Sequence, residues 1–175
     1  MTTLTVWRYD TPFGADAGAV RLKVLAERKV LTVHDAVTVA WMPQAKEPVI
    51  GHLKHATAAS AGKGSVLGGL VGMLVMAPVA GAALGAGVAS VAARLRKSGI
   101  DEEFVRELGS QLTPGSSALL VLSSDGKLDE LRPAMERELD RGDVVLLHAE
   151  LSDDAPAAIV EAMDELLGDD GPSRG

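Results

Sequence analysis

The sequence contains thirty consecutive residues without a charged side chain, 64–93, between Lys63 and Arg94. Half of them are small, with seven Gly and eight Ala. Pro78 lies near the middle of this stretch, and because proline lacks a backbone donor it disfavours one continuous helix. We therefore predict a helical hairpin over about 58–96, with two arms of about 14 residues, or about 21 Å, each.

Each predicted arm has a face of small residues and a face of larger ones, because positions four apart share a helix face. Small residues let two helix backbones approach closely, as in membrane helix pairs. Each Gly costs about 1 kcal/mol in a water-exposed helix, so close packing or an apolar environment must compensate. The residues expected to serve helix packing and oligomerisation are Gly64, Gly68, Gly72, Pro78, Gly81, Gly85 and Ala89. The larger residues of the first arm are Leu67, Leu70, Val71 and Leu74.

Basic residues flank the charge-free stretch on both sides. They are Lys54 and Lys63 before it, and Arg94, Arg96 and Lys97 after it. This matches the excess of basic residues on the cytoplasmic side of membrane segments. Since arms of about 21 Å are shorter than a hydrocarbon core of about 30 Å, a shallow or re-entrant hairpin fits better than two full spans. The alternatives are a shared core of a soluble oligomer and burial within the chain's own domain.

The remainder of the chain alternates strand and helix patterns. Strands are expected at 3–9, 35–42, 118–122 and 143–149, with a short partner strand around Val49, Ile50 and Leu53. Amphipathic helices are expected at 15–28, from Asp101 onward, at 127–140 and at 154–167. Asp101 is the expected N-cap of its helix, with Ile100 and Val105 at the hydrophobic-staple positions.

Without the hairpin, the order of elements is β-α-β followed by β-α-β, with one extra helix before the third strand. This order is typical of the ferredoxin-like α+β fold. We expect one such domain over 1–167, interrupted by the hairpin, and a disordered tail at 168–175.

The sequence resembles the bacterial domain-of-unknown-function family numbered 1269, whose members are described as predicted membrane proteins. The resemblance is carried by Val37-Thr38-Val39 before the hairpin, by the Gly/Ala stretch around Pro78, and most specifically by residues 99–109 and 114–119. It implies a ferredoxin-like platform with a glycine-zipper-like hairpin, and it supplies no catalytic residues.

The rest of the sequence argues against an enzyme. The net charge of −7 disfavours nucleic-acid binding, and the absence of Cys excludes thiol chemistry and disulfides. The stretch 62–65 lacks the spacing of a phosphate loop, and the pair His52 and His55 is expected at the surface rather than on a metal. Gly115-Ser116-Ser117 lacks the spacing of a nucleophile elbow. We expect no cofactor, metal or catalytic site.

These observations predict a non-enzymatic, self-associating protein on the cytoplasmic face of a membrane, which uses 64–93 for bilayer insertion and helix packing. The N-terminus shows no signal-peptide pattern. The alternative is a soluble cytoplasmic homo-oligomer, or a shell-forming protein, whose hairpins make the shared core. Expected partners are a lipid bilayer and further copies of the chain.

Overall fold

A computed structural model describes residues 2–53, 67–68, 70–72, 99–140 and 144–152 of the 175-residue chain. Five strands form one sheet in the order β3-β2-β4-β1-β5. The strands are β1 (Thr2–Tyr9), β2 (Thr32–Ala40), β3 (Val49–His52), β4 (Ser117–Ser124) and β5 (Val144–Leu151). The helices are α1 (Gly14–Glu27), α4 (Glu102–Gln111) and α5 (Leu128–Leu139). The α+β class expected from the sequence is confirmed.

All paired strands of the sheet are antiparallel. β4 lies between β1 and β2, and β1 lies between β4 and β5. The units β1-α1-β2 and β4-α5-β5 therefore interlock, since each places a strand between the two strands of the other. The strands on either side of the charge-free stretch belong to this single sheet, with β2 and β3 before the stretch and β4 after it.

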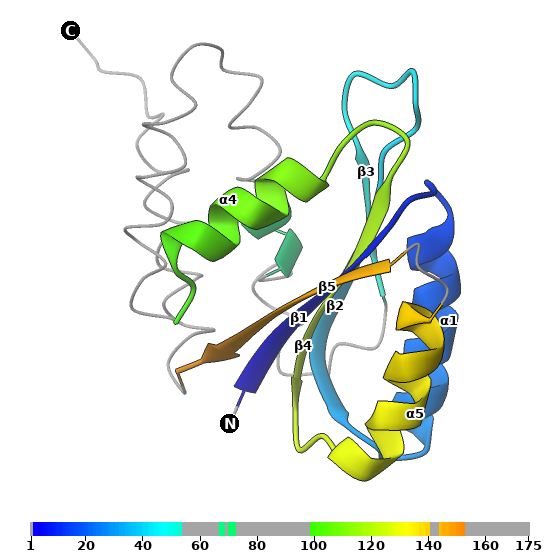
Figure 1. The fold of residues 1–175 in the computed structure, drawn as a ribbon, viewed down its shortest axis with the longest axis vertical. Coiled ribbons are helices and arrows are strands. Elements are labelled where there is room, and N and C mark those ends of the chain that lie inside the picture. Colours follow the sequence, from blue (N-terminus) through cyan, green and yellow to red (C-terminus); the bar gives the residue numbers. More distant parts are fainter. Residues whose placement is uncertain (1, 54–66, 69, 73–98, 141–143, 153–175) are drawn as a thin grey trace, which may run out of the picture.

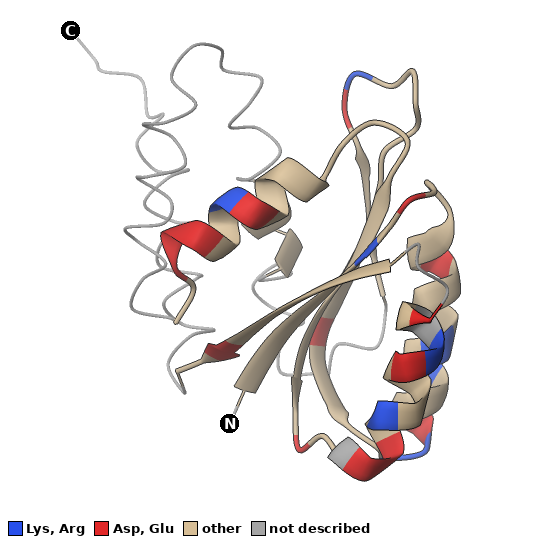
Figure 2. Ribbon diagram, in the orientation of Figure 1, with Lys and Arg blue, Asp and Glu red and all other residues tan. Residues whose placement is uncertain are grey.

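The sheet separates two apolar layers (Figure 1). Helices α1 and α5 lie side by side over one face, where Tyr9, Ala15, Ala19, Leu119 and Val121 form the smaller core cluster. Helix α4 lies over the other face and contributes to the larger cluster, which includes Leu4, Val6, Val37, Val39, Phe104, Leu108 and Leu120. Charged residues gather on the helices and leave the sheet mostly free of charge (Figure 2).

Helix α1 meets the sheet through its smallest residues. A Cβ on Gly14 would lie 2.4 Å from Tyr9 Cβ, and one on Gly18 would lie 2.3 Å from Tyr9 Oη. Only a glycine at these positions allows the helix to rest directly on the Tyr9 ring. The sequence places Val24 among the apolar residues of the amphipathic helix expected at 15–28, but this residue is 40% exposed.

Helix α4 begins as the sequence predicted. The Asp101 carboxylate accepts a hydrogen bond of 2.8 Å from the Phe104 N–H, and the predicted N-cap is confirmed. Ile100 and Val105, at the staple positions, are both fully buried in the larger core cluster. The start of α4 is thus fixed both by local hydrogen bonding and by the core.

Two other sequence-based expectations need correction. The second strand was expected at 35–42 but covers 32–40, because Thr32 and Val33 already pair with β4, across a bulge between Val33 and Asp35. The sequence places Leu128, Leu131, Met135 and Leu139 on one apolar stripe of the helix expected at 127–140, but Leu139, the last residue of α5, is 42% exposed. The helix expected at 154–167 and the tail at 168–175 lie outside the described residues. Within the described part of the chain, no helix is long and apolar enough to cross a bilayer.

Candidate functional site

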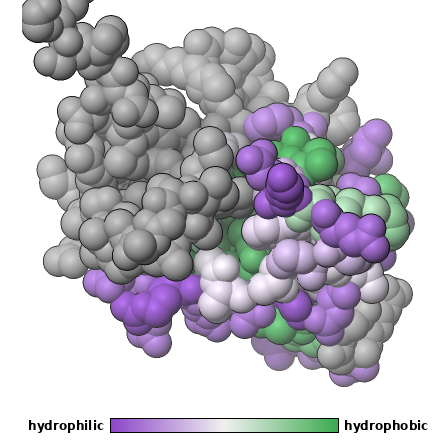
Figure 3. Space-filling model, turned by 90° about the horizontal axis from the view of Figure 1, so that it is seen from above, coloured by the Kyte–Doolittle hydropathy of each residue, from purple (hydrophilic) through white to green (hydrophobic). Residues whose placement is uncertain are grey.

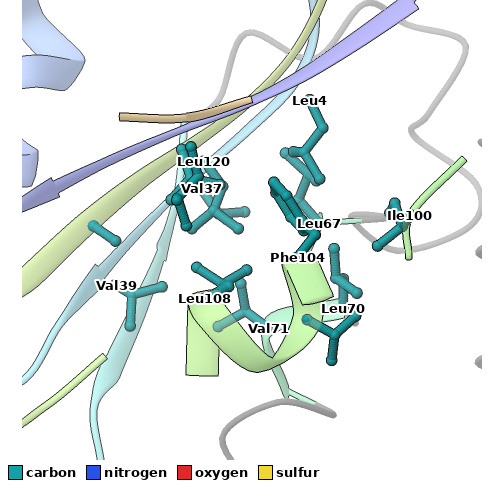
Figure 4. Packing of buried hydrophobic residues seen from close by; sticks show 14 of the residues in the cluster. Leu4, Val37, Val39, Leu67, Leu70, Val71, Ile100, Phe104, Leu108 and Leu120 are labelled. Carbon is teal, nitrogen blue, oxygen red and sulfur yellow. The ribbon is translucent and has the colours of Figure 1, made fainter. Parts of the chain in front are cut away.

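The candidate site is the described beginning of the charge-free stretch, residues 67–68 and 70–72, which we call the root. These residues are helical. Leu67, Leu70 and Val71 are at most 1% exposed and belong to the larger core cluster. Figure 4 shows Leu67 between the α4 ribbon and the strands of the sheet, with Leu70 and Val71 beside the α4 ribbon. The larger residues of the first predicted arm are therefore part of the domain's own core at these positions.

A buried carboxylate on β2 holds the first residue of the root. Leu67 N–H donates a hydrogen bond of 3.0 Å to Asp35 Oδ2, and Asp35 is only 6% exposed. A buried carboxylate needs a hydrogen-bond donor, and the Leu67 N–H supplies one. Asp35 thus anchors the backbone of a helical segment that follows it by 32 residues.

Helix α4 closes the site from the side opposite the sheet. Phe104 and Leu108 lie one turn apart on its inner face and join the same cluster as the root. Deep burial of three large side chains, at about 25 cal/mol per Å² of apolar surface, stabilises this arrangement by several kcal/mol. The root is held by side chains from the sheet and from α4 together.

The chain re-enters the described structure on the same face of the sheet. Gly99 has φ +90°, and a Cβ at this position would lie 2.6 Å from the backbone oxygen of Glu150 at the end of β5. Only glycine both adopts this positive φ without strain and leaves room for the Glu150 backbone. Ile100 then enters the cluster that also holds Leu67 and Leu70. The described residues on either side of 73–98 are therefore held on one face of one sheet, since Val71 and Ile100 are buried in the same cluster.

The small residues of the root occupy its other side. Gly68 and Gly72 are partly exposed, whereas Leu67, Leu70 and Val71 are buried. No atom of the described chain lies within 4 Å of a Cβ placed on Gly72. The separation of a small and a bulky face, predicted from the four-residue spacing, is present at these positions.

The other residues expected to act in packing or at the membrane lie outside the described part of the chain. The packing residues concerned are Gly64, Pro78, Gly81, Gly85 and Ala89. The flanking basic residues concerned are Lys54, Lys63, Arg94, Arg96 and Lys97. The described structure therefore brings together only Gly68 and Gly72 of the predicted set.

The described polar residues hold the fold together. Ser117 Oγ donates to Thr11 O at 2.6 Å and accepts from Ala15 N–H at 3.0 Å, which ties β4 to the first turn of α1. Ser116 Oγ bonds both the N–H and the carbonyl of Thr113. His52 is exposed, and His55 is outside the described residues. Among the described residues, no group of three or more His, Asp or Glu side chains could hold a metal ion.

Sequence reasoning did not identify Asp35 as part of the site. It placed this residue at the start of a Val-rich strand and gave it no role. The available signal was a carboxylate within a buried strand pattern, since buried charges need a partner. That the partner would be the Leu67 amide could not be read from the sequence.

The comparisons with known proteins identify a family and nothing further. The model of the family described as "Protein of unknown function (DUF1269)" matches residues 61–164. The chain therefore belongs to this family. No curated protein and no solved structure matches the chain.

Proposed function

We propose that this member of the DUF1269 family is a non-enzymatic membrane-associated protein, in which the sheet domain carries the charge-free stretch and the stretch contacts the bilayer and other copies. The single observation that carries the proposal is the burial of Val71 and Ile100, which precede and follow residues 73–98, in one cluster on one face of one sheet. A segment whose two ends are attached in this way must leave and return on the same side of a membrane. A hairpin satisfies this condition and a single span does not.

The buried root sets how far such a hairpin can reach. Because Leu67, Leu70 and Val71 are occupied in the core, residues 73–93 are what remains for lipid contact. Two arms of about 10 residues extend about 15 Å, half of a hydrocarbon core of about 30 Å. Shallow insertion, with the flanking Lys and Arg residues at the headgroups, is the form of membrane contact that we propose.

We also propose that the platform is a ferredoxin-like domain with one added edge strand. With β3 set aside, the strand order is β2-β4-β1-β5, the two βαβ units interlock, and α1 and α5 share a face. Helix α4 and the root, on the opposite face, are then additions to this pattern.

A soluble homo-oligomer is the second candidate, and one observation favours it. The bulky side of the root is buried within its own domain, while the sides of Gly68 and Gly72 are partly exposed. A small-residue face can pack against another helix in water as well as in lipid. In this case copies associate through the small faces without a bilayer.

Flotation with vesicles tests the proposal. The full chain is mixed with vesicles of neutral lipid alone, or with vesicles that contain about 30% anionic lipid. Anionic lipid is included because basic clusters next to a membrane segment are attracted to anionic surfaces. The matched variant replaces 73–93 by a short Gly/Ser linker, which keeps the buried root in place. We expect the full chain to float, more strongly with anionic lipid, and the variant to stay in solution as a folded protein.

Two controls separate the candidates. The triple variant Arg94→Gln, Arg96→Gln and Lys97→Gln should lose the preference for anionic vesicles. If the full chain does not float but forms a large lipid-free assembly that the linker variant abolishes, the soluble oligomer is correct and the membrane proposal is wrong.

A further inference from the structure

Helix α1 presents an apolar stripe to the surface. Phe13 and Val20 are 65% and 66% exposed, Val24 is 40% exposed, and Ala17 is exposed between them. Their spacing of four, three and four residues is that of a coiled-coil seam, so all four lie along one line of the helix. The described chain leaves this stripe uncovered, and its charged neighbours keep it narrow (Figure 2).

A cleft of about 580 Å³ runs beside the stripe, between α1 and the end of the β2–β3 pair. Its walls are largely apolar and include Ala19, Val20, Val33 and Leu53. Asp16, Lys23 and Glu27 line it from α1, and Lys23 Nζ lies 4.0 Å from Glu27 Oε1. Seen from above, the described surface shows several separate apolar areas among polar ones (Figure 3). The stripe and its cleft thus form one elongated apolar surface, with Asp16, Lys23 and Glu27 along one flank.

We infer that this surface binds a second copy of the chain, through two α1 helices packed antiparallel about a two-fold axis. The stripe is self-complementary in this arrangement. Suppose that Ala17 of one copy faces Val20 of the other. Because the second helix runs in the opposite direction, each step back along one helix is matched by a step forward along the other. Phe13 of one copy, four residues before Ala17, then faces Val24 of the other, four residues after Val20. A surface that complements itself closes into a dimer rather than a chain of copies.

The flanking charges favour the same arrangement. In an antiparallel pair related by a two-fold axis, each flank of one helix faces the same flank of the other. Asp16 and Lys23 share the cleft-side flank. In the register set by the stripe, Asp16 of one copy comes within about two residues, or about 3 Å along the axis, of Lys23 of the other. Two symmetric Asp16–Lys23 pairs result, and such pairs set register more than they add affinity.

The cleft accounts for the most exposed aromatic side chain described. In this arrangement Phe13 of the second copy packs on Val24, next to the part of the cleft that Lys23, Ala26 and Glu27 line. Burial of an aromatic ring in an apolar cleft is a typical anchor of an interface. The seam between Phe13 and Val24 is only about 17 Å long, so the interface is small. We expect a dimer with a dissociation constant in the micromolar range, which separates on dilution.

The test uses the full chain, and it benefits from the absence of cysteine. Ala17→Cys is treated with a bis-maleimide that spans about 10 Å, the separation that an antiparallel helix pair gives these positions. Glu136→Cys, on the exposed face of α5, is the matched control. We expect covalent dimers from Ala17→Cys at tens of micromolar protein, and at least ten times fewer from Glu136→Cys.

Substitutions on α1 then test the register by sedimentation velocity. Val20→Asp should raise the dissociation constant at least tenfold, and its exposed site leaves the fold intact. Lys23→Glu should weaken the dimer severalfold, and Asp16→Lys combined with Lys23→Glu should restore it. If Ala17→Cys does not cross-link, or if the combined variant fails to recover, this inference is wrong.

Other outcomes identify another occupant or another interface. A monomer that Val20→Asp destabilises would place a segment of the same chain on the stripe and overturn the inference. Association that survives Val20→Asp but disappears when 73–93 is replaced would belong to the charge-free stretch and would also overturn it. Because the vesicle experiment does not involve α1, failure here leaves the proposed membrane contact standing.

Discussion

Replacement of Leu67 by Ala measures whether the root belongs to the folded domain. Leu67 is 0% exposed and lies in the cluster with Leu4, Phe104 and Leu108. Truncation removes three carbon atoms and leaves a cavity that the sheet and α4 cannot fully fill. Core Leu→Ala substitutions cost about 2–5 kcal/mol, and the rigid sheet on one side argues for about 3 kcal/mol here.

The assay is urea unfolding followed by circular dichroism, supported by thermal unfolding. The denaturant midpoint should fall without a change of slope, because the surface exposed on unfolding is nearly the same. For a chain of this length, about 3 kcal/mol corresponds to about 6–12 °C in Tm. Leu4→Ala, also 0% exposed, is the positive control, and Val20→Ala, at an exposed position, should stay within about 0.5 kcal/mol.

The result that refutes this reasoning is a Leu67→Ala variant as stable as Val20→Ala while Leu4→Ala loses several kcal/mol. The root would then lie outside the cooperative core. Its large residues would be available for lipid or for another copy, and the reach of about 15 Å derived for the hairpin would be too short.

Three further substitutions test individual contacts of the site, and a fourth, at Gly115, serves as a control. Asp35→Ala should cost about 1–3 kcal/mol and speed hydrogen exchange of the Leu67 amide, because a buried donor loses its acceptor; unchanged exchange would contradict the Asp35–Leu67 hydrogen bond. Gly99→Ala should lower stability in thermal unfolding by about 2–5 kcal/mol, since strain at positive φ adds to a backbone clash. Gly115 also has a positive φ, but a Cβ there would meet only a side chain at 3.8 Å, so Gly115→Ala should lower the stability by about 1–2 kcal/mol. If Gly99→Ala and Gly115→Ala lose the same stability, the backbone clash at Gly99 is ruled out. Gly72→Ala should raise stability by up to about 1 kcal/mol, because alanine favours helix and the added methyl group meets no atom of the described chain; a loss in chemical denaturation would reveal a close neighbour there.

Local patterns in the sequence determined much of the platform. Alternation of apolar and polar residues predicted β1, and a continuous apolar run predicted β4. The start of α4 followed from Asp101 and its neighbours alone. These features were readable because the interactions behind them join residues within a few positions of one another, so the same short stretch that shows the pattern also contains both partners.

The sequence by itself also predicted a small-residue face and a bulky face over 64–93 from four-residue spacing. At the described positions 67–68 and 70–72, the larger residues are buried and the glycines are partly exposed. What covers the bulky face was decided by the tertiary structure. Leu67 meets Asp35 across 32 residues and shares a core with residues of α4. The inward face of α1 was likewise set by a contact, between Gly18 and the Tyr9 ring. Such pairings depend on which elements the folded sheet brings together, and no pattern within a single segment contains that information.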